Sequence, residues 1–285
     1  MTLLEAITLG VIQGLTEFLP VSSTAHLRVI PPLLGWEDPG AAYSAVIQCG
    51  TLMAVIAAMW PDVVALARGF VAGVVGGRPW QTVESRVALL IVLGTLPIVV
   101  VGFALRDLVK GDARRMEVVI GALLAATLLM AAAEWVTTRR AARGAAPRDG
   151  LEGIGLRDGL GMGFAQVLAL VPGTSRSGVT IASGMLGGLD RRTAARFSFL
   201  LSLPAVAAAG LLEAWEERAG ILGSADGIVA ALAGTTAAAV VGYAAIRWLL
   251  SMLGSRTLWP FIVYRLALAA LLAWALATGR VPSLG

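Results

Sequence analysis

Six apolar stretches, each long enough to cross a bilayer as a helix, constrain the fold of this chain more than any other feature. Several of them hold 18 or more residues with few charges, which is the pattern of transmembrane helices. The sequence therefore predicts an all-α integral membrane protein. The predicted spans are residues 41–60, 87–105, 117–136, 195–215, 228–250 and 258–278.

The composition agrees with a membrane protein. Apolar residues make up 58% of the 285 residues and charged residues only 14%, whereas soluble domains average about 25% charged residues. The pI near 10 is also typical of nucleic-acid-binding proteins, but here the arginines lie in loops between the predicted spans. Because that distribution is the positive-inside pattern, we expect a lipid bilayer as the surroundings and no nucleic acid as a partner.

The longest polar stretch, residues 139–158, divides a single polytopic membrane domain (1–285) into halves 1–138 and 159–285. The halves resemble each other weakly where each has a segment interrupted by Pro or Gly. Aligned on their prolines, the two segments share four residue types, with a slip of one residue between Gln and Pro. The pairs are Gly10 with Gly163, Gln13 with Gln166, Pro20 with Pro172, and Ser23 with Ser175.

Three predicted spans follow each interrupted segment. If each segment enters and leaves on the same side of the membrane, the odd number of spans inverts the second half relative to the first. We therefore expect about six spans plus two re-entrant broken-helix segments in an inverted-topology repeat, an architecture that places polar sites where the breaks meet. More arginines and lysines lie on the side of loop 139–158, which favours a cytoplasmic loop and both termini outside.

The first interrupted segment carries ionisable and hydroxyl residues at membrane depth. Gln13 and Glu17 lie four apart on one helical face, and "VSSTAH" then supplies Ser22, Ser23 and His26. A charge inside hydrocarbon needs a partner, a proton or a metal. Either serine could lie near the imidazole if the helix continues, and spacing does not choose between them. The alternative without a functional role is that Glu17 lies at the membrane–water interface and His26 caps a helix.

The second interrupted segment, "PGTSRSGVT" at residues 172–180, predicts an anion site. A Gly/Ser-rich turn that opens a helix directs unpaired N–H groups and the positive end of the helix dipole at a ligand. Arg176 adds a planar fork that suits phosphate oxygens. The alternative is an arginine that reaches the lipid headgroups.

Brought together by the repeat, the two segments predict a phosphoryl-transfer site. One supplies an acid, a hydroxyl nucleophile and an imidazole, and the other supplies phosphate-binding groups. A secondary transporter or lipid flippase is the alternative from another class, because inverted repeats with broken helices also occur there. Lipid phosphatases that use a histidine nucleophile need a second histidine, and this chain has one.

"QGLTEFLPVSSTAH" and "PGTSRSGVT" closely resemble the two signature motifs of the bacterial undecaprenyl-diphosphate phosphatase family, which is linked to bacitracin resistance. The resemblance extends over nearly the whole chain, including "LGTLPIVVVG" at 93–102 and "FIVYRLALA" at 261–269. It implies removal of the terminal phosphate from undecaprenyl diphosphate at the outer face of the bacterial plasma membrane, which recycles the lipid carrier for peptidoglycan synthesis. It further implies a divalent cation, Mg²⁺ or Ca²⁺, and a homodimer.

The resemblance also assigns roles to residues. Ser23 is the first choice for nucleophile and Ser22 the second, His26 is the general acid/base, and Glu17 positions the histidine or the metal. A direct histidine nucleophile stays open. The first motif carries Gln13 where the family has Glu or Gln, so a cation at Glu17 would take further ligands from substrate oxygens or water. Arg176, Ser175, Ser177, Thr180 and the Gly173–Thr174 backbone would hold the diphosphate.

Overall fold

The computed structural model describes residues 1–37, 40–106, 108, 112–216, 225–281 and 283. Within these ranges the regular structure is helical and contains no β-strand, apart from an isolated bridge between Arg148 and Leu189. The prediction of an all-α protein is confirmed. The α-helices are α1 Leu3–Phe18, α2 Ser23–Leu33, α3 Gly40–Ala58, α4 Trp60–Val75, α5 Val83–Ala104, α7 Met116–Ala142, α8 Leu156–Val167, α9 Arg176–Leu186, α10 Arg191–Glu216, α12 Ala225–Met252 and α13 Trp259–Ala277, with short 3-10 turns at Asp112–Arg114, Leu151–Gly153 and Leu168–Leu170.

Five described helices are long and apolar enough to cross a membrane alone, namely α5, α7, α10, α12 and α13. A sixth span exists only if Tyr43–Ala58 and Trp60–Val75 are counted together, because they are bent by 83°. Pro61 explains the bend, since it has no N–H to bond back to the carbonyl of Ala57 and its ring clashes with that carbonyl, which breaks the helix at Met59. The span predicted at 41–60 therefore continues into a second helix, α4, that the sequence reading did not foresee.

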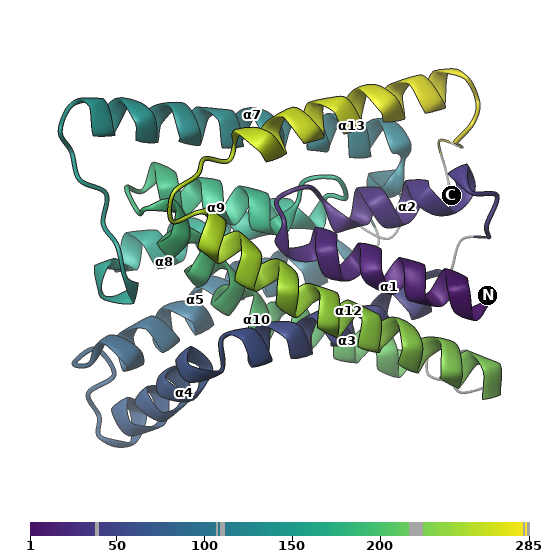
Figure 1. Ribbon diagram of the computed structural model, residues 1–285. Helices are drawn as coiled ribbons and strands as arrows, with labels where there is room; N and C mark the ends of the chain where they lie inside the picture. The colour runs from purple at the N-terminus through teal and green to yellow at the C-terminus, as the bar shows by residue number, and fades with distance from the viewer. Residues whose placement is uncertain (38–39, 107, 109–111, 217–224, 282, 284–285) are drawn as a thin grey trace.

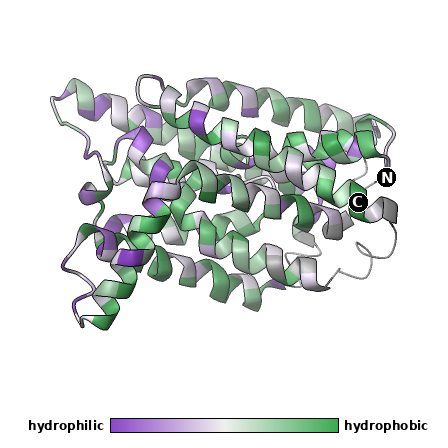
Figure 2. Ribbon diagram, turned by 60° about the horizontal axis from the view of Figure 1, so that its bottom comes forward, coloured by the Kyte–Doolittle hydropathy of each residue, from purple (hydrophilic) through white to green (hydrophobic). Residues whose placement is uncertain are grey.

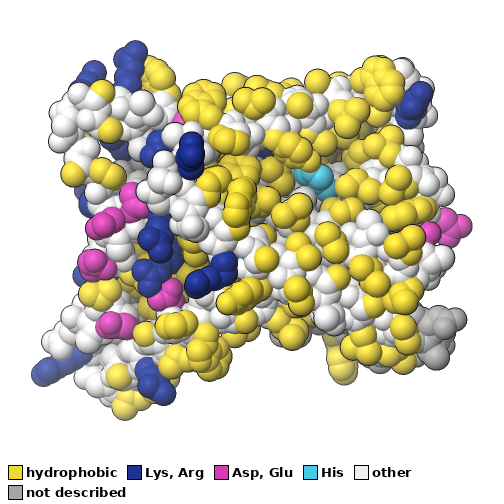
Figure 3. Space-filling view, in the orientation of Figure 1, with side chains coloured by type: hydrophobic (Ala, Val, Ile, Leu, Met, Phe, Trp, Pro, Cys, Tyr) yellow, Lys and Arg dark blue, Asp and Glu magenta, His cyan; other side chains and the backbone are white. Residues whose placement is uncertain are grey.

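The surface separates into apolar and charged regions, as expected for a multi-pass membrane protein. Hydrophobic side chains cover most of the face shown in Figure 3, and Lys and Arg gather at the end where α7 connects to α8. Figure 2 shows hydrophilic residues concentrated at the same end. Both chain termini lie at the opposite end (Figure 1). Large apolar side chains such as Phe103, Leu128 and Leu4 are exposed, which suits contact with lipid tails.

The two interrupted segments contain a break between α1 and α2 and a break between α8 and α9. The breaks are built alike, but the residues that correspond differ from those paired by aligning the prolines. Ser22 (φ 75°, ψ 95°) and Ser175 (φ 70°, ψ 104°) are the only non-glycine residues of the described chain with positive φ, and each immediately precedes a helix. Pairing them gives a constant offset of 153 residues that also relates Gln13 to Gln166. The sequence pairing of Ser23 with Ser175 is therefore wrong by one residue, because the prolines sit at different positions within the two breaks.

Glycines let the first helix of each broken segment pack closely against a span of the other half. Gly10 of α1 lies against the backbone of Gly234 in α12, and its counterpart Gly163 of α8 lies against the backbone of Gly94 in α5. Even one Cβ at these positions would meet a backbone oxygen, so small residues are required for the contact. These contacts hold α1 and α8, which lead into the two breaks, against the rest of the bundle.

α10 is the most buried of the spans and forms the centre of the bundle. Its Phe199 ring packs edge-on against Phe18 at the end of α1, with ring centroids 5.5 Å apart. Three ion pairs fasten the end of the molecule that carries loop 139–158. Arg148 binds Asp158, Arg191 binds the fully buried Glu134, and Arg196 binds Asp62.

Candidate functional site

The two breaks in the helices touch each other. The Gly173 N–H donates to the hydroxyl of Thr24 over 3.1 Å, and the Ser177 hydroxyl donates to the carbonyl of Leu19 over 3.2 Å. These bonds join residues about 150 positions apart in the chain. The broken segments therefore form one polar region between the two halves of the protein.

Glu17, at the end of α1, is the centre of this region. One carboxylate oxygen accepts hydrogen bonds from the Ser23 hydroxyl at 2.7 Å and from the Gln13 amide at 3.1 Å. The other oxygen accepts from the Arg176 guanidinium at 3.1 Å. Four residues predicted from the sequence are thus brought together, three from the first broken segment and one from the second.

The Glu17–Arg176 pair is largely shielded from solvent. Only 9% of the Glu17 side chain and 12% of the Arg176 side chain are exposed, so their attraction is screened far less than that of a surface ion pair. The second terminal nitrogen of Arg176, Nη1, is buried and has no hydrogen-bond partner among the described residues. An unpaired guanidinium donor in such surroundings is suited to an anionic ligand. The pocket beside the pair is lined by Phe18, Thr51, Leu52, Val55, Ser202 and Val206.

The structure distinguishes the two serines that spacing alone left equivalent. Ser23 is the first residue of α2 and is half-buried, with its hydroxyl on the Glu17 carboxylate. Ser22 lies before the helix, is 1% exposed, and has its hydroxyl 3.1 Å from that of Thr24. A carboxylate in contact can accept the proton of a hydroxyl nucleophile. Ser23 has the Glu17 carboxylate as such a neighbour, whereas the neighbour of Ser22 is the hydroxyl of Thr24.

His26 is placed differently from the expected contact with a serine hydroxyl. Its Nδ1 lies 2.7 Å from the Ser22 carbonyl oxygen, and its Nε2 lies 2.6 Å from the hydroxyl of Tyr264. The neutral imidazole with the proton on Nδ1 satisfies both bonds, because Nε2 then accepts from Tyr264. The positive φ of Ser22 takes its side chain out of the helical register, while Ser23 points to Glu17, so the imidazole meets a carbonyl instead.

The predicted diphosphate-binding residues of the second segment divide into two groups. Ser175 and Arg176 are half-buried at the start of α9, and the Ser175 hydroxyl caps the helix by accepting from the Gly178 N–H. Ser177 and Thr180 are buried and have partners inside the protein. The hydroxyl of Thr180, for example, donates to the Arg176 carbonyl and lies 2.6 Å from that of Ser198. Gly173 and Thr174 are buried within the break itself.

Sequence reasoning assigned no role to Arg265, which the structure places behind both breaks. Its fully buried guanidinium donates to the Thr127 hydroxyl at 2.8 Å and to the carbonyls of Thr174 at 3.0 Å and Pro20 at 3.3 Å. Arg265 therefore ties the first break, the second break and α7 together. The signal was present in the sequence, because an arginine in the middle of a predicted span is a functional candidate by default.

The carboxylates around the site do not make a metal site by themselves. Among the described residues no group of three or more His, Cys, Asp or Glu side chains is close enough to hold an ion. Glu17 has Gln13 as its neighbour where a second carboxylate would be needed, and both of its oxygens accept hydrogen bonds. This donor set fits a cation shared with a substrate phosphate, as Mg²⁺ sites often are, but not one held by protein alone.

Comparison with known proteins identifies the family. The family model described as bacitracin resistance protein BacA matches residues 6–271. Proteins named undecaprenyl-diphosphatase are similar over the full chain. One from Chlorobium phaeovibrioides is 47% identical over 99% of both chains, and one from Chlorobium limicola is 45% identical over 99% of this chain and 100% of its own. A third, from Chlorobaculum tepidum, is 44% identical over 99% of both chains. The protein therefore belongs to the bacitracin resistance protein BacA family.

Proposed function

We propose that this protein is an undecaprenyl-diphosphatase, which hydrolyses undecaprenyl diphosphate to undecaprenyl phosphate and inorganic phosphate. The relatives that carry this name match the chain from end to end. The structural observation that carries the proposal is the Ser23 hydroxyl on the Glu17 carboxylate, with Arg176 on the other oxygen. By the family's description, the activity would confer bacitracin resistance by recycling the lipid carrier of cell-wall synthesis.

In the proposed reaction Ser23 is the nucleophile and Glu17 the base. The Ser23 oxygen forms a bond to the terminal phosphorus while Glu17 takes the hydroxyl proton. The bond between that phosphorus and the bridging oxygen breaks, and undecaprenyl phosphate leaves. Water then attacks the phosphoserine and the bond between the Ser23 oxygen and phosphorus breaks. Glu17 returns its proton to the Ser23 oxygen, which restores the hydroxyl and the carboxylate, and inorganic phosphate leaves.

Charge on the transferring phosphoryl group is held by Arg176 and by two helix N-termini. Arg176 has an unpartnered Nη1 beside the site. The first turns of α2 and α9 meet at the two breaks, and the α2 N-terminus has no side-chain cap. Their N–H groups and helix dipoles favour an anion at this point. Donors fixed before the reaction stabilise developing charge without reorganisation.

The expected cation, Mg²⁺ or Ca²⁺, remains part of the proposal. Glu17 would supply one ligand and the diphosphate oxygens others, with Gln13 nearby. A bound divalent ion neutralises phosphate charge in phosphoryl transfer. The protein's own groups are responsible for orienting the serine and holding the diphosphate.

His26 has a supporting role in this proposal instead of the general acid/base role expected from the resemblance. Both of its ring nitrogens are engaged, one with the Ser22 carbonyl and the other with Tyr264. A histidine held in this way fixes the backbone at the start of α2, where Ser23 begins the helix. For the same reason, a direct attack by His26 on phosphorus would first require the bond to Tyr264 to break.

We also propose that the protein lies in the bacterial plasma membrane with the site open to the outside, and that it forms a homodimer. The topology is supported by the basic residues near loop 139–158 and by the termini at the other end (Figure 1). A cysteine added after the C-terminal residue in a Cys49→Ala background should react with an impermeant maleimide on intact cells. Protection from that reagent would reverse the orientation.

Phosphate release from undecaprenyl diphosphate by purified protein in detergent tests the activity. Release is expected, should fall with a chelator and should return when Mg²⁺ or Ca²⁺ is added. Folded protein that releases none under any of these conditions would contradict the proposal. Transport in vesicles without hydrolysis would then support the alternative of a transporter or flippase.

A further inference from the structure

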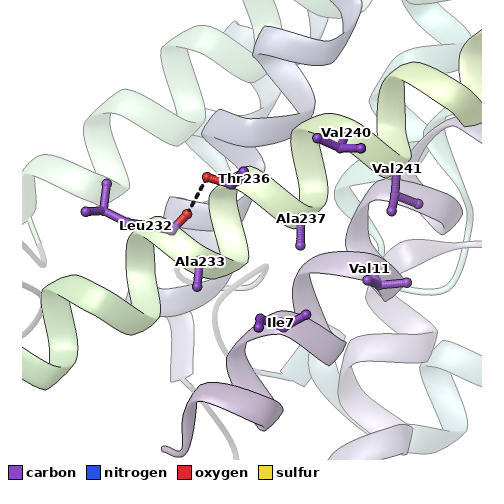
Figure 4. Close-up of a pocket in the computed structure, with 8 residues that line it drawn as sticks. All are labelled: Ile7, Val11, Leu232, Ala233, Thr236, Ala237, Val240 and Val241. Atoms are coloured by element: carbon purple, nitrogen blue, oxygen red, sulfur yellow. Dashed lines mark hydrogen bonds between the residues drawn. The ribbon is translucent and has the colours of Figure 1, made fainter.

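Two apolar grooves open on the hydrocarbon surface of the described chain. The first lies between α1 and α12 (Figure 4), where Val11, Ala233, Ala237 and Val240 form its walls, and its one hydroxyl, on Thr236, donates to a carbonyl of its own helix. The second lies among α3, α4, α5 and α10. Their volumes are about 600 Å³ and about 450 Å³, so size does not distinguish them. The walls of the second include Leu52, Ile56, Leu66, Phe70, Leu203 and Ala207.

The second groove adjoins the small pocket beside Glu17 and Arg176. Leu52 of α3 lines both. Further along α3 and α10, Val55 and Val206 face the polar pocket while the residues next to each in sequence line the groove. The first groove shares no lining residue with that pocket within the described chain. Of these two grooves, only the second therefore borders the charged site.

The bend between α3 and α4 makes the second groove. Because α4 leaves α3 at 83°, its residues Leu66 and Phe70 form one wall, and α5 and α10 form the others. A straight helix through residue 75 would not place these side chains beside α10. The bend between α3 and α4, which the sequence did not predict, thus shapes the groove beside the site.

We propose that the groove among α3, α4, α5 and α10 binds the part of the isoprenoid tail nearest the diphosphate while the diphosphate is held beside Ser23 and Arg176. This inference rests on the proposed function. The chemistry matches at both ends, since the groove walls are hydrocarbon and the adjoining pocket carries an arginine with an unpartnered donor. Bilayer lipid also solvates a tail, so the groove contributes packing and orientation more than hydrophobic transfer energy.

Ala207→Trp tests the proposal by filling the groove from α10. The comparison is kcat/KM for phosphate release from farnesyl diphosphate and from dimethylallyl diphosphate, whose tail is too short to extend along the groove. The wild type should prefer the longer tail, and the variant should lose about tenfold on farnesyl diphosphate with little change on the short substrate. Ala237→Trp in the groove of Figure 4 is the matched control, because Ala237 is also half-buried on a lipid-facing span, and it should leave both rates unchanged.

Several outcomes would overturn the proposal. Equal loss on both substrates by a folded Ala207→Trp protein, unchanged rates, or a change in oligomeric state alone would mean that lipid or a second copy covers this groove. If Ala207→Trp does not fold, Ala67→Trp fills the same groove from an exposed position on α4 and should show the same selectivity for tail length. A wild type that cleaves neither substrate nor undecaprenyl diphosphate would contradict the proposed function itself, which is a different result.

Discussion

Ser23 and Arg176 occupy the same position in the two halves of the protein, and both bind Glu17. Each is the first residue of the helix that follows a break, each comes directly after a serine with positive φ, and they are 153 positions apart. The hydroxyl donates to one carboxylate oxygen of Glu17 and the guanidinium donates to the other. The repeated backbone thus directs two different side chains to the Glu17 carboxylate. The first half supplies the Ser23 hydroxyl, and the second half supplies the Arg176 cation.

Glu17→Gln should abolish most phosphate release while the protein remains folded. The amide keeps the size of the side chain but cannot accept the Ser23 proton, and general-base catalysis contributes about 10²- to 10⁴-fold in rate. The measurement is kcat for undecaprenyl diphosphate in detergent. Glu5→Gln on the same helix is the control, because Gln also serves in the capping box that Glu5 forms with Thr2. A Glu17→Gln enzyme with normal kcat would remove the base from the mechanism.

Arg176→Lys should lower kcat/KM by about a hundredfold. Lysine keeps the positive charge but replaces a planar fork, which can hold Glu17 and a phosphate oxygen together, with a single point charge. Steady-state kinetics of the variant test this, with Arg192→Lys at an exposed position as the control. Near-normal turnover would mean that Arg176 only caps the start of α9.

Arg265→Met should destabilise the protein by about 3 kcal/mol, because the carbonyls of both breaks would lose their buried charged donor. The measurement is thermal unfolding in detergent alongside kcat. Arg247→Met removes an exposed arginine from α12 and should leave Tm unchanged. If Arg265→Met unfolds at the wild-type temperature, the breaks are held together by their direct hydrogen bonds alone.

The Arg148–Asp158 pair should make stability depend on pH at the end of the molecule that carries loop 139–158. Burial alone would raise the pKa of Asp158, but hydrogen bonds from Arg148 and the Gly155 N–H outweigh it and hold that pKa below its usual value. A depressed carboxyl pKa contributes stability above the unfolded-state value, near 3.9, which is lost as pH falls through the folded-state value.

The difference in Tm between wild type and Asp158→Asn should therefore be full at neutral pH and shrink as the solution is acidified below about pH 4. Asp149→Asn, in the same loop and exposed, is the matched control. A difference that grows on acidification would mean instead that folding raises the pKa of Asp158.

The spans were predictable because a long apolar run is a local signal, and five of the six predicted stretches match helices that can cross a membrane alone. The sixth was only partly predicted. Asp62 and Arg68 interrupt the apolar pattern of α4, so the helix beyond Pro61 had no spanning signal of its own. α4 is the second member of the bent pair with α3, and it packs beside α5 and α10, which lie further along the chain.

The residues of the site were predictable, but their pairing was not. Glu17, Ser23 and Arg176 stood out as polar groups at membrane depth. The tie between His26 and Tyr264 spans 238 positions, and no spacing rule reaches that far. The position of Ser22 depends on which residue of the break takes a positive φ, and a proline alignment cannot show this. Only the folded backbone, with positive φ at Ser22 and Ser175, shows the offset of 153 residues.

A comparison of Ser23→Ala with Ser22→Ala in the phosphate-release assay tests most directly whether Ser23 is the nucleophile. Ser23 touches the Glu17 carboxylate and Ser22 touches Thr24. Both variants should fold, since each loses a single hydroxyl. Ser23→Ala should abolish hydrolysis of undecaprenyl diphosphate, while Ser22→Ala should retain most of it. The reverse order, or full activity in Ser23→Ala, would mean that Ser23 is not the nucleophile.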